Sequence, residues 1–177
     1  MAEIEIHHEH GHAHDADPFG RRVGVLVAVI GIFLSAVTIE SHRTHTAAIV
    51  YKTEANDQWA FYQAKKIRGH MMDVGATLLD ALGSDPARTR AAADRLAADR
   101  DRYAREADGI QKEAEARERE SRQAEHRALL FDLGEGLLEL GLVLSSLYFL
   151  SKRRFFPALG SIAALGGLGL GIAGLLV

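Results

Sequence analysis

The stretch LGSDPAR, residues 82–88, decides the fold because it is the strongest helix break in a long charged segment. Gly83 can end one helix in the left-handed conformation. Asp85 can cap the next helix, and Pro86 suits its first position. The stretch therefore predicts a tight turn between two helices near residues 83–86.

The two arms that flank this turn are nearly equal in length, at residues 40–82 and 86–131. No other strong helix breaker interrupts either arm. We therefore expect residues 40–131 to form an antiparallel helical hairpin about 65 Å long, at 1.5 Å per residue. Acidic and basic residues alternate along the second arm. Nucleic-acid binding is not expected, because it needs a one-sided basic surface.

Each arm also carries an apolar pattern that is typical of coiled-coil packing. In the second arm the pattern consists of Leu96, Tyr103 and Ile110 with Ala107, Ala114 and Ala128. In the first arm it consists of Ala60, Ile67, Val74 and Ala81 with Ala64, Met71 and Leu78. Because alanine buries little area, a single hairpin would be weakly held, and self-association of several hairpins is expected to help.

Three apolar blocks lie outside the hairpin, at residues 21–39, 132–151 and 156–177. Each is close to the ~20 residues that an α-helix needs to cross the hydrocarbon core of a bilayer. A signal peptide is the alternative for the first block, but its apolar run is long and no small-x-small site follows Ala36. The sequence predicts an all-α membrane protein with three transmembrane helices, the first two continuous with the hairpin.

Basic residues predict how these helices are oriented. Arg21 and Arg22 precede the first block, and the run Lys-Arg-Arg at 152–154 links the second block to the third. Such clusters favour the cytoplasmic side, whereas long loops translocate largely regardless of charge. The N-terminus is therefore expected in the cytoplasm, with the hairpin and the C-terminus extracytoplasmic.

Three carboxylates interrupt the second block: Asp132, Glu135 and Glu139. At 100° per residue they fall within an arc of about 60°, with Glu139 roughly 10 Å inside the outer boundary. A carboxylate at that depth costs about 2.5–3.5 kcal/mol, unless it protonates, finds a partner or faces water. By the symmetry of the hairpin its neighbours are Gly31 and Ser35, and no basic partner lies at that depth. The acidic stripe is either a hydrogen-bonded packing device or the lining of a cation or proton pathway.

Small residues line two of the predicted spans, which lets helix backbones approach closely. The first stripe comprises Gly24, Ala28, Gly31, Ser35 and Thr38. The second comprises Gly160, Ala163, Gly167, Gly171 and Gly174. The pattern predicts tight helix packing, either within one chain or between chains.

An aromatic group, Trp59, Phe61 and Tyr62, lies in the first arm of the hairpin. Its position is about 30 Å beyond the first span, so a role at the lipid interface would require a sharp kink. It is either a packed layer opposite Ala107 and Ile110 or a binding patch for a periplasmic protein.

Residues 1–20 form a histidine-rich tail that we expect to be disordered. Its histidines are His7, His8, His10, His12 and His14, interleaved with carboxylates. Imidazoles and carboxylates are ligands for Zn²⁺ or Ni²⁺, and such tracts bind metal without a folded site. We expect weak binding, which is either adventitious or the property of a metal sensor or delivery arm.

Catalytic chemistry is not expected. The chain has no cysteine, and the histidines of the arms, His42, His45, His70 and His126, are scattered singly. There is no serine nucleophile constellation and no phosphate-cradling glycine loop. The sequence instead favours an oligomeric scaffolding protein. The alternative is a channel or transport component that uses Glu139 and Glu135.

Two stretches carry a resemblance to a known family: NDQWAFYQAKKIR and FDLGEGLLELGLVLSSLYFLSKRRFFPALG. The chain resembles a bacterial membrane-protein family known as domain-of-unknown-function family 4337. The resemblance covers nearly the whole chain and implies a bacterial inner-membrane protein. It implies no activity and no catalytic residue. The expected partners are membrane lipid and further copies of the chain.

Overall fold

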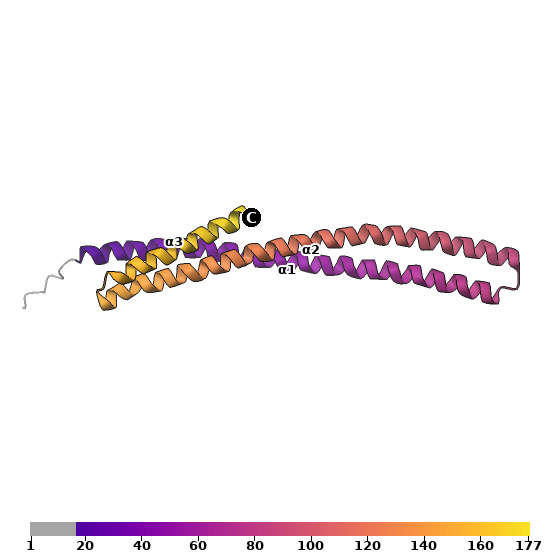
Figure 1. Cartoon of the computed structure of the whole chain (residues 1–177), viewed down its shortest axis with the longest axis horizontal. Coiled ribbons are helices and arrows are strands. Elements are labelled where there is room, and N and C mark those ends of the chain that lie inside the picture. The colour runs from indigo at the N-terminus through magenta and orange to yellow at the C-terminus, as the bar shows by residue number, and fades with distance from the viewer. Residues whose placement is uncertain (1–16) are drawn as a thin grey trace, which may run out of the picture.

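The computed structural model describes residues 17–177, which form three α-helices and no strand. The helices are α1 (Pro18–Leu82), α2 (Pro86–Ser151) and α3 (Phe155–Leu176). Figure 1 shows α1 and α2 side by side in opposite directions, with α3 folded back along the half of the pair that is farthest from their turn. The predicted all-α class is confirmed.

Both long helices begin at an aspartate followed by a proline. The Asp17 carboxylate accepts a hydrogen bond from the Gly20 N–H at 2.8 Å. The Asp85 carboxylate accepts hydrogen bonds from the Ala87 and Arg88 N–H groups at 3.0 and 3.3 Å. These caps satisfy amide groups that have no partner within their own helix.

The predicted left-handed conformation of Gly83 is wrong. Gly83 has φ −69° and ψ 118°, which is extended backbone. Only residues 83–85 join α1 to α2. Packed helix axes lie about 8–10 Å apart, and Gly83 and Asp85 are both extended in the short link that spans this distance.

Among residues 17–177 the left-handed conformation occurs instead at Lys152, with φ 55°. Its N–H donates to the Tyr148 carbonyl oxygen at 2.7 Å and ends α2. The Tyr148 hydroxyl in turn donates to the Asp17 carboxylate at 3.0 Å. The Gly20 N–H, followed by Tyr148 and Lys152, holds the pKa of Asp17 below its usual range. The start of α1 and the end of α2 are thereby fastened together.

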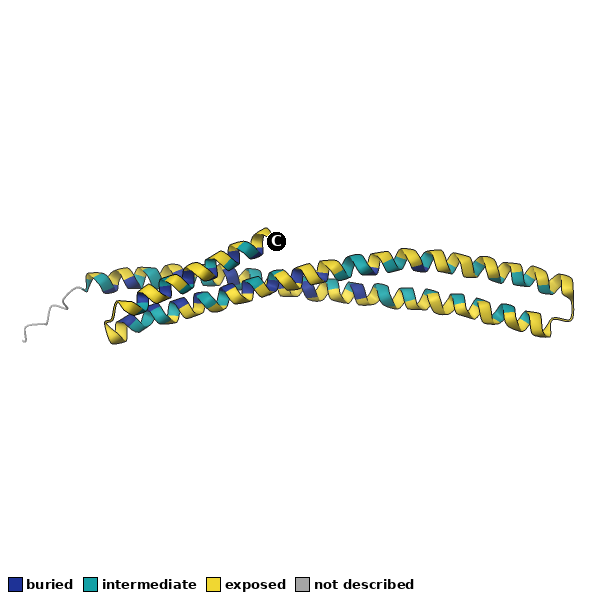
Figure 2. Cartoon of the chain, in the orientation of Figure 1, coloured by how far each residue is buried: buried dark blue, intermediate teal, exposed yellow. Residues whose placement is uncertain are grey.

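The halves of α1 and α2 next to the turn are joined by ion pairs around a thin apolar seam. Figure 2 shows burial decreasing toward the turn, and between residues 56 and 106 no residue is fully buried. The ion pairs between the helices are Lys65–Glu106, Asp73–Arg100 at 3.5 Å and Glu54–Arg117 at 3.3 Å. Exposed pairs of this kind contribute little stability each, so this part of the molecule is only loosely held.

The structure overturns the predicted seam of the first arm. Its four large residues point away from α2 and are 54% to 62% exposed: Ile67, Met71, Val74 and Leu78. The residues of α1 from 55 to 82 that are buried or half-buried are Ala55, Gln58, Trp59, Tyr62, Lys65, Gly69, Met72, Gly75, Ala76 and Leu79. In the second arm, the predicted Ala107, Ala114 and Ala128 are buried. The outer half of α1 has two apolar faces, and periodicity alone does not reveal which one meets α2.

Glu106→Gln is expected to lower the stability of the α1–α2 pair slightly at pH 7. Hydrogen bonding to Lys65, aided by its charge, holds the pKa of Glu106 below its usual range. A carboxylate with a lowered pKa stabilises the fold above its ordinary pKa, and that stability is lost as the pH falls through the folded value. Thermal unfolding of the variant and the wild type should therefore converge below about pH 4. Glu113→Gln, on the exposed side of α2, is the control and should leave unfolding at pH 7 unchanged; a larger effect there would contradict this account.

Candidate functional site

Close packing of α3 on α2 determines which side of α2 is left for the acidic residues. A Cβ atom built on Gly141 would lie 2.7 Å from the Gly160 carbonyl oxygen, and one on Gly167 would lie 2.6 Å from the Gly134 oxygen. The two backbones are therefore in direct contact, and Leu138 is fully buried. The small-residue stripe of α3 packs within the chain, a choice that the sequence left open.

The outer end of α3 is fastened by side chains of α2. Arg127 donates from Nε to the Gly174 carbonyl oxygen at 3.1 Å, and Gln123 donates from Nε2 to the Val177 oxygen at 2.9 Å. A cation at a helix C-terminus also interacts favourably with the helix dipole. These contacts place the end of α3 beside the helical turn of α2 that precedes Phe131.

Asp132 bridges α2 to α1. Its Oδ1 accepts a hydrogen bond from the Ser41 hydroxyl at 2.7 Å, and its Oδ2 lies 3.0 Å from His45 Nε2. The side chains of Asp132 and His45 remain about half exposed. Asp132 of α2 is thus linked to both Ser41 and His45 of α1.

Glu135 forms the next link in the same direction. Its Oε1 accepts a hydrogen bond from the Thr38 hydroxyl at 2.7 Å. Two successive carboxylates of α2 thus meet two successive hydroxyl groups of α1. In an apolar environment such interhelical hydrogen bonds hold helices together.

Glu139 differs from the other two carboxylates. It is exposed, and it forms no hydrogen bond or ion pair with any of residues 17–177. On the facing part of α1, a Cβ atom built on Gly31 would lie 3.8 Å from a methyl carbon of Leu142, so the neighbour there is apolar. Of the three carboxylates, Glu139 is therefore the one without a partner among residues 17–177.

The hydroxyl partners Ser41 and Thr38 and the imidazole of His45 are the site residues that the sequence interpretation missed. Ser41 and Thr38 are three residues apart along α1, as are Asp132 and Glu135 along α2. This equal spacing is the signal in the sequence, because matching the arms residue by residue from LGSDPAR would pair Asp132 with Ala36, five residues from Ser41.

The aromatic group does not act as one unit. Trp59 and Tyr62 meet edge to face, with ring centroids 5.5 Å apart, whereas Phe61 is 60% exposed. Sequence neighbours on a helix point in different directions, so three aromatics within four residues cannot share one layer.

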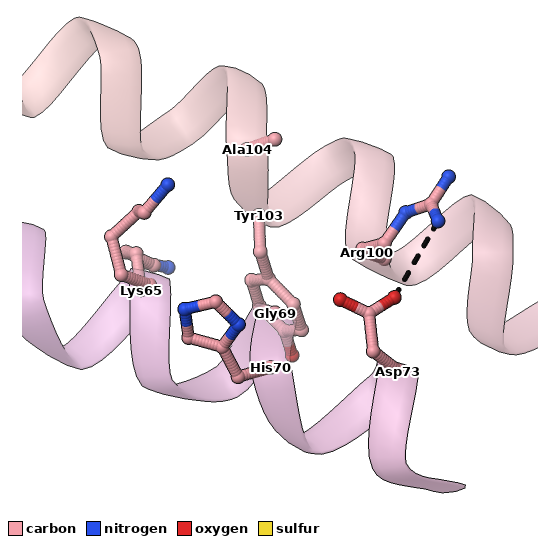
Figure 3. Close-up of a pocket in the computed structure, with 8 residues that line it drawn as sticks. Lys65, Gly69, His70, Asp73, Arg100, Tyr103 and Ala104 are labelled. Atoms are coloured by element: carbon pink, nitrogen blue, oxygen red, sulfur yellow. Dashed lines mark hydrogen bonds and ion pairs between the residues drawn. The ribbon is translucent and has the colours of Figure 1, made fainter. Parts of the chain in front are cut away.

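A shallow pocket between α1 and α2 lies farther toward the turn (Figure 3). It is lined by Lys65, Lys66, Gly69, His70, Asp73, Arg100, Tyr103 and Ala104. The Lys65 ammonium lies 5.5 Å from the centroid of the Tyr103 ring, and Arg100 reaches Asp73 across the pocket. Lys65, Asp73 and Arg100 are engaged in the ion pairs that join α1 to α2.

The predicted metal ligands of the tail, from His7 to His14, lie outside the described residues. Within residues 17–177 no three histidine, aspartate or glutamate side chains are grouped so that they could hold a metal ion. Weak Zn²⁺ or Ni²⁺ binding by the tail stays a prediction.

Comparison with known proteins identifies one family. The family model described as "Domain of unknown function (DUF4337)" matches residues 19–177. No curated protein and no solved structure matches the chain. By length and composition, α1 and α3 each contain a stretch that could cross a membrane.

Proposed function

This chain belongs to the DUF4337 family, and from its helix arrangement we propose that it is a non-enzymatic, oligomeric scaffolding protein of the bacterial inner membrane. Residues 21–39, 132–151 and 156–177 would form a three-helix membrane base. Residues 40–131 would form a periplasmic stalk. The N-terminus would lie in the cytoplasm.

The continuity of α1 and α2 is the observation that carries this proposal. Each helix runs without interruption from an apolar half, where α3 packs, into a charged half that α3 does not reach (Figure 1). Such a helix pair can hold a binding surface at a fixed distance from the bilayer, because a continuous helix rises 1.5 Å with every residue. The charged half would project beyond the bilayer and present binding surfaces there.

The chemistry of the stalk supports a structural role over a catalytic one. Its pocket lies between paired charges, and its surface alternates acids and bases. Its polar groups join one helix to the other. The expected partners are membrane lipid, further copies of the chain and a periplasmic protein.

Orientation is tested by single cysteines, since the chain has none of its own. Ser84→Cys at the turn is expected to react with a membrane-impermeant maleimide in intact cells. Ser151→Cys at the end of α2 is expected to react only after the cells are opened. Both positions are exposed, so they differ in compartment and not in burial. Labelling of Ser151→Cys in intact cells would reverse the proposed topology.

A second function, a cation or proton pathway, is favoured by the unpartnered Glu139. Several copies could place this carboxylate around a water-filled axis, as rings of acidic residues do in cation channels. Glu135, already bonded to Thr38, would then lie one turn farther out.

The Glu139→Gln variant discriminates between the two functions. Glutamine keeps the size and hydrogen-bonding capacity of the side chain but removes its charge. If the protein is a scaffold, liposomes that contain either form should show no flux of cations or protons above that of empty liposomes. Wild-type flux that the variant abolishes, at unchanged oligomer size, would establish the pathway instead.

A further inference from the structure

The outer half of α1 carries an apolar stripe that no other part of the described chain covers. We call it the outer α1 stripe; it consists of Ala60, Ala64, Ile67, Met71, Val74, Leu78 and Ala81. All seven residues are exposed, and the four large ones are 54% to 62% exposed. Soluble surfaces rarely leave contiguous apolar patches of this kind without a partner.

The spacing within the stripe specifies the kind of surface that fits it. Its members alternate by four and three residues, which is the a/d pattern of a coiled coil. The residues that face α2 follow the same period, so the stripe stays on the opposite side of α1 over about 32 Å, at 1.5 Å per residue. A second helix with the same repeat is the complementary partner.

Charge distinguishes between the surfaces that could cover the stripe. The exposed residues of α2 at this level are mostly charged, with alanines between them; the charged ones include Arg90, Asp94, Arg95, Asp101, Arg105 and Asp108. An α1 stripe placed there would bury charges without partners, which is costly. The residues beside the stripe are mostly uncharged: Phe61, Gln63, Arg68, His70, Gly75, Thr77 and Leu82. Two copies of α1 can therefore meet with Arg68 as the single like-charged position.

We propose that a second copy of the chain covers the outer α1 stripe, with the two α1 helices parallel and in register. The inference rests on the proposed function, because it needs the stripe outside the bilayer and all copies inserted in one orientation. A twofold axis then relates the two stripes, each serving as the partner surface of the other. Ala64, Met71 and Leu78 take the a positions, and the other four residues take the d positions. The pairing supplies the apolar core that the single stalk lacks between residues 56 and 106.

Single-cysteine cross-linking in native membranes tests the pairing. Facing a and d residues of a parallel coiled coil come within the Cα separation of about 4.4–6.8 Å that a disulfide requires. Oxidation is expected to give covalent dimers of Ile67→Cys, Met71→Cys, Val74→Cys and Leu78→Cys. Lys66→Cys and Asp80→Cys, exposed on the same helix but outside the stripe, are the matched controls and should stay monomeric.

A second variant removes the apolar surface without disturbing the chain fold. Val74→Asp places a charge on a side chain that is exposed in the single chain, so helicity measured by circular dichroism should not change. It is expected to raise the Kd of the dimer in detergent by at least about tenfold, because a buried charge would have no partner. Lys66→Asp, exposed on the same helix but outside the stripe, should leave the Kd unchanged.

Cross-linking that is absent, or equal at stripe and control positions, overturns the inference. If the protein remains oligomeric and the Ser84→Cys topology holds in that case, the proposed scaffold survives and only its interface is wrong. If the protein is monomeric in native membranes, the inference and the oligomeric scaffold both fail. A dimer that persists unchanged in Val74→Asp likewise overturns the assignment of the interface to this stripe.

Discussion

Leu138→Ala is expected to lower the free energy of unfolding by about 2 kcal/mol or more. Leu138 is fully buried in a cluster with Ile30, Val37, Phe131 and Ala164, at the place where all three helices meet. Truncation leaves a cavity that the backbone contacts of α2 and α3 prevent from closing. In the proposed membrane base the loss comes from packing contacts, not from exposure to water, because lipid is as apolar as leucine.

The measurement is unfolding of the purified protein in detergent, followed by far-ultraviolet circular dichroism. Leu140→Ala is the matched control: the same substitution, two residues along α2, at a side chain that is 48% exposed. The control should change stability by less than about 0.5 kcal/mol. Equal losses in the two variants would mean that the three helices do not share this core.

Gly167→Ala is expected to separate α3 from α2. The new methyl group would lie 2.6 Å from the Gly134 oxygen and 3.0 Å from the Leu138 nitrogen, and both are backbone atoms that no rotamer change can move. Overpacking of this kind costs about 1–3 kcal/mol. It outweighs the gain of about 1 kcal/mol that alanine brings to a helix.

Gly169→Ala on the same helix isolates the steric effect. A Cβ atom at this position meets nothing within 4 Å, so the variant keeps the gain in helix propensity and should be as stable as the wild type or more so. Limited proteolysis at the link between α2 and α3 gives a second readout, with faster cleavage expected for Gly167→Ala alone. A Gly167→Ala variant that unfolds like Gly169→Ala would refute the close α2–α3 contact.

Leu138→Ala and Gly167→Ala both change the three-helix base of the molecule, where the candidate site also lies. Asp132 and Glu135 are held by hydroxyl groups of α1, while α3 covers the neighbouring side of α2. The position of Glu139 is therefore a consequence of helix packing. Any assembly that gives this carboxylate a partner must approach the side of α2 that α3 leaves open.

Local sequence alone determined the helical class and the place where α2 begins. Asp85 and Pro86 act on the residues next to them through capping and a fixed φ angle, so their effect can be read without the fold. The matched arms and the apolar blocks are also properties of the chain itself. The conformation of Gly83 could not be read in this way, because it depends on the distance that the link has to cross.

Only the tertiary structure decided which surfaces meet. The stripe from Ala60 to Ala81 and the opposite side of α1 both carry apolar residues. Contacts with α2, such as the ion pair of Lys65 with Glu106, decide that the side opposite the stripe faces α2. The partners of Asp132 and Glu135, and the packing of α3 on α2 instead of on another copy, were decided in the same way. Periodicity defines the faces of a helix, but the choice among them depends on side chains that are distant in sequence and meet only in the folded chain.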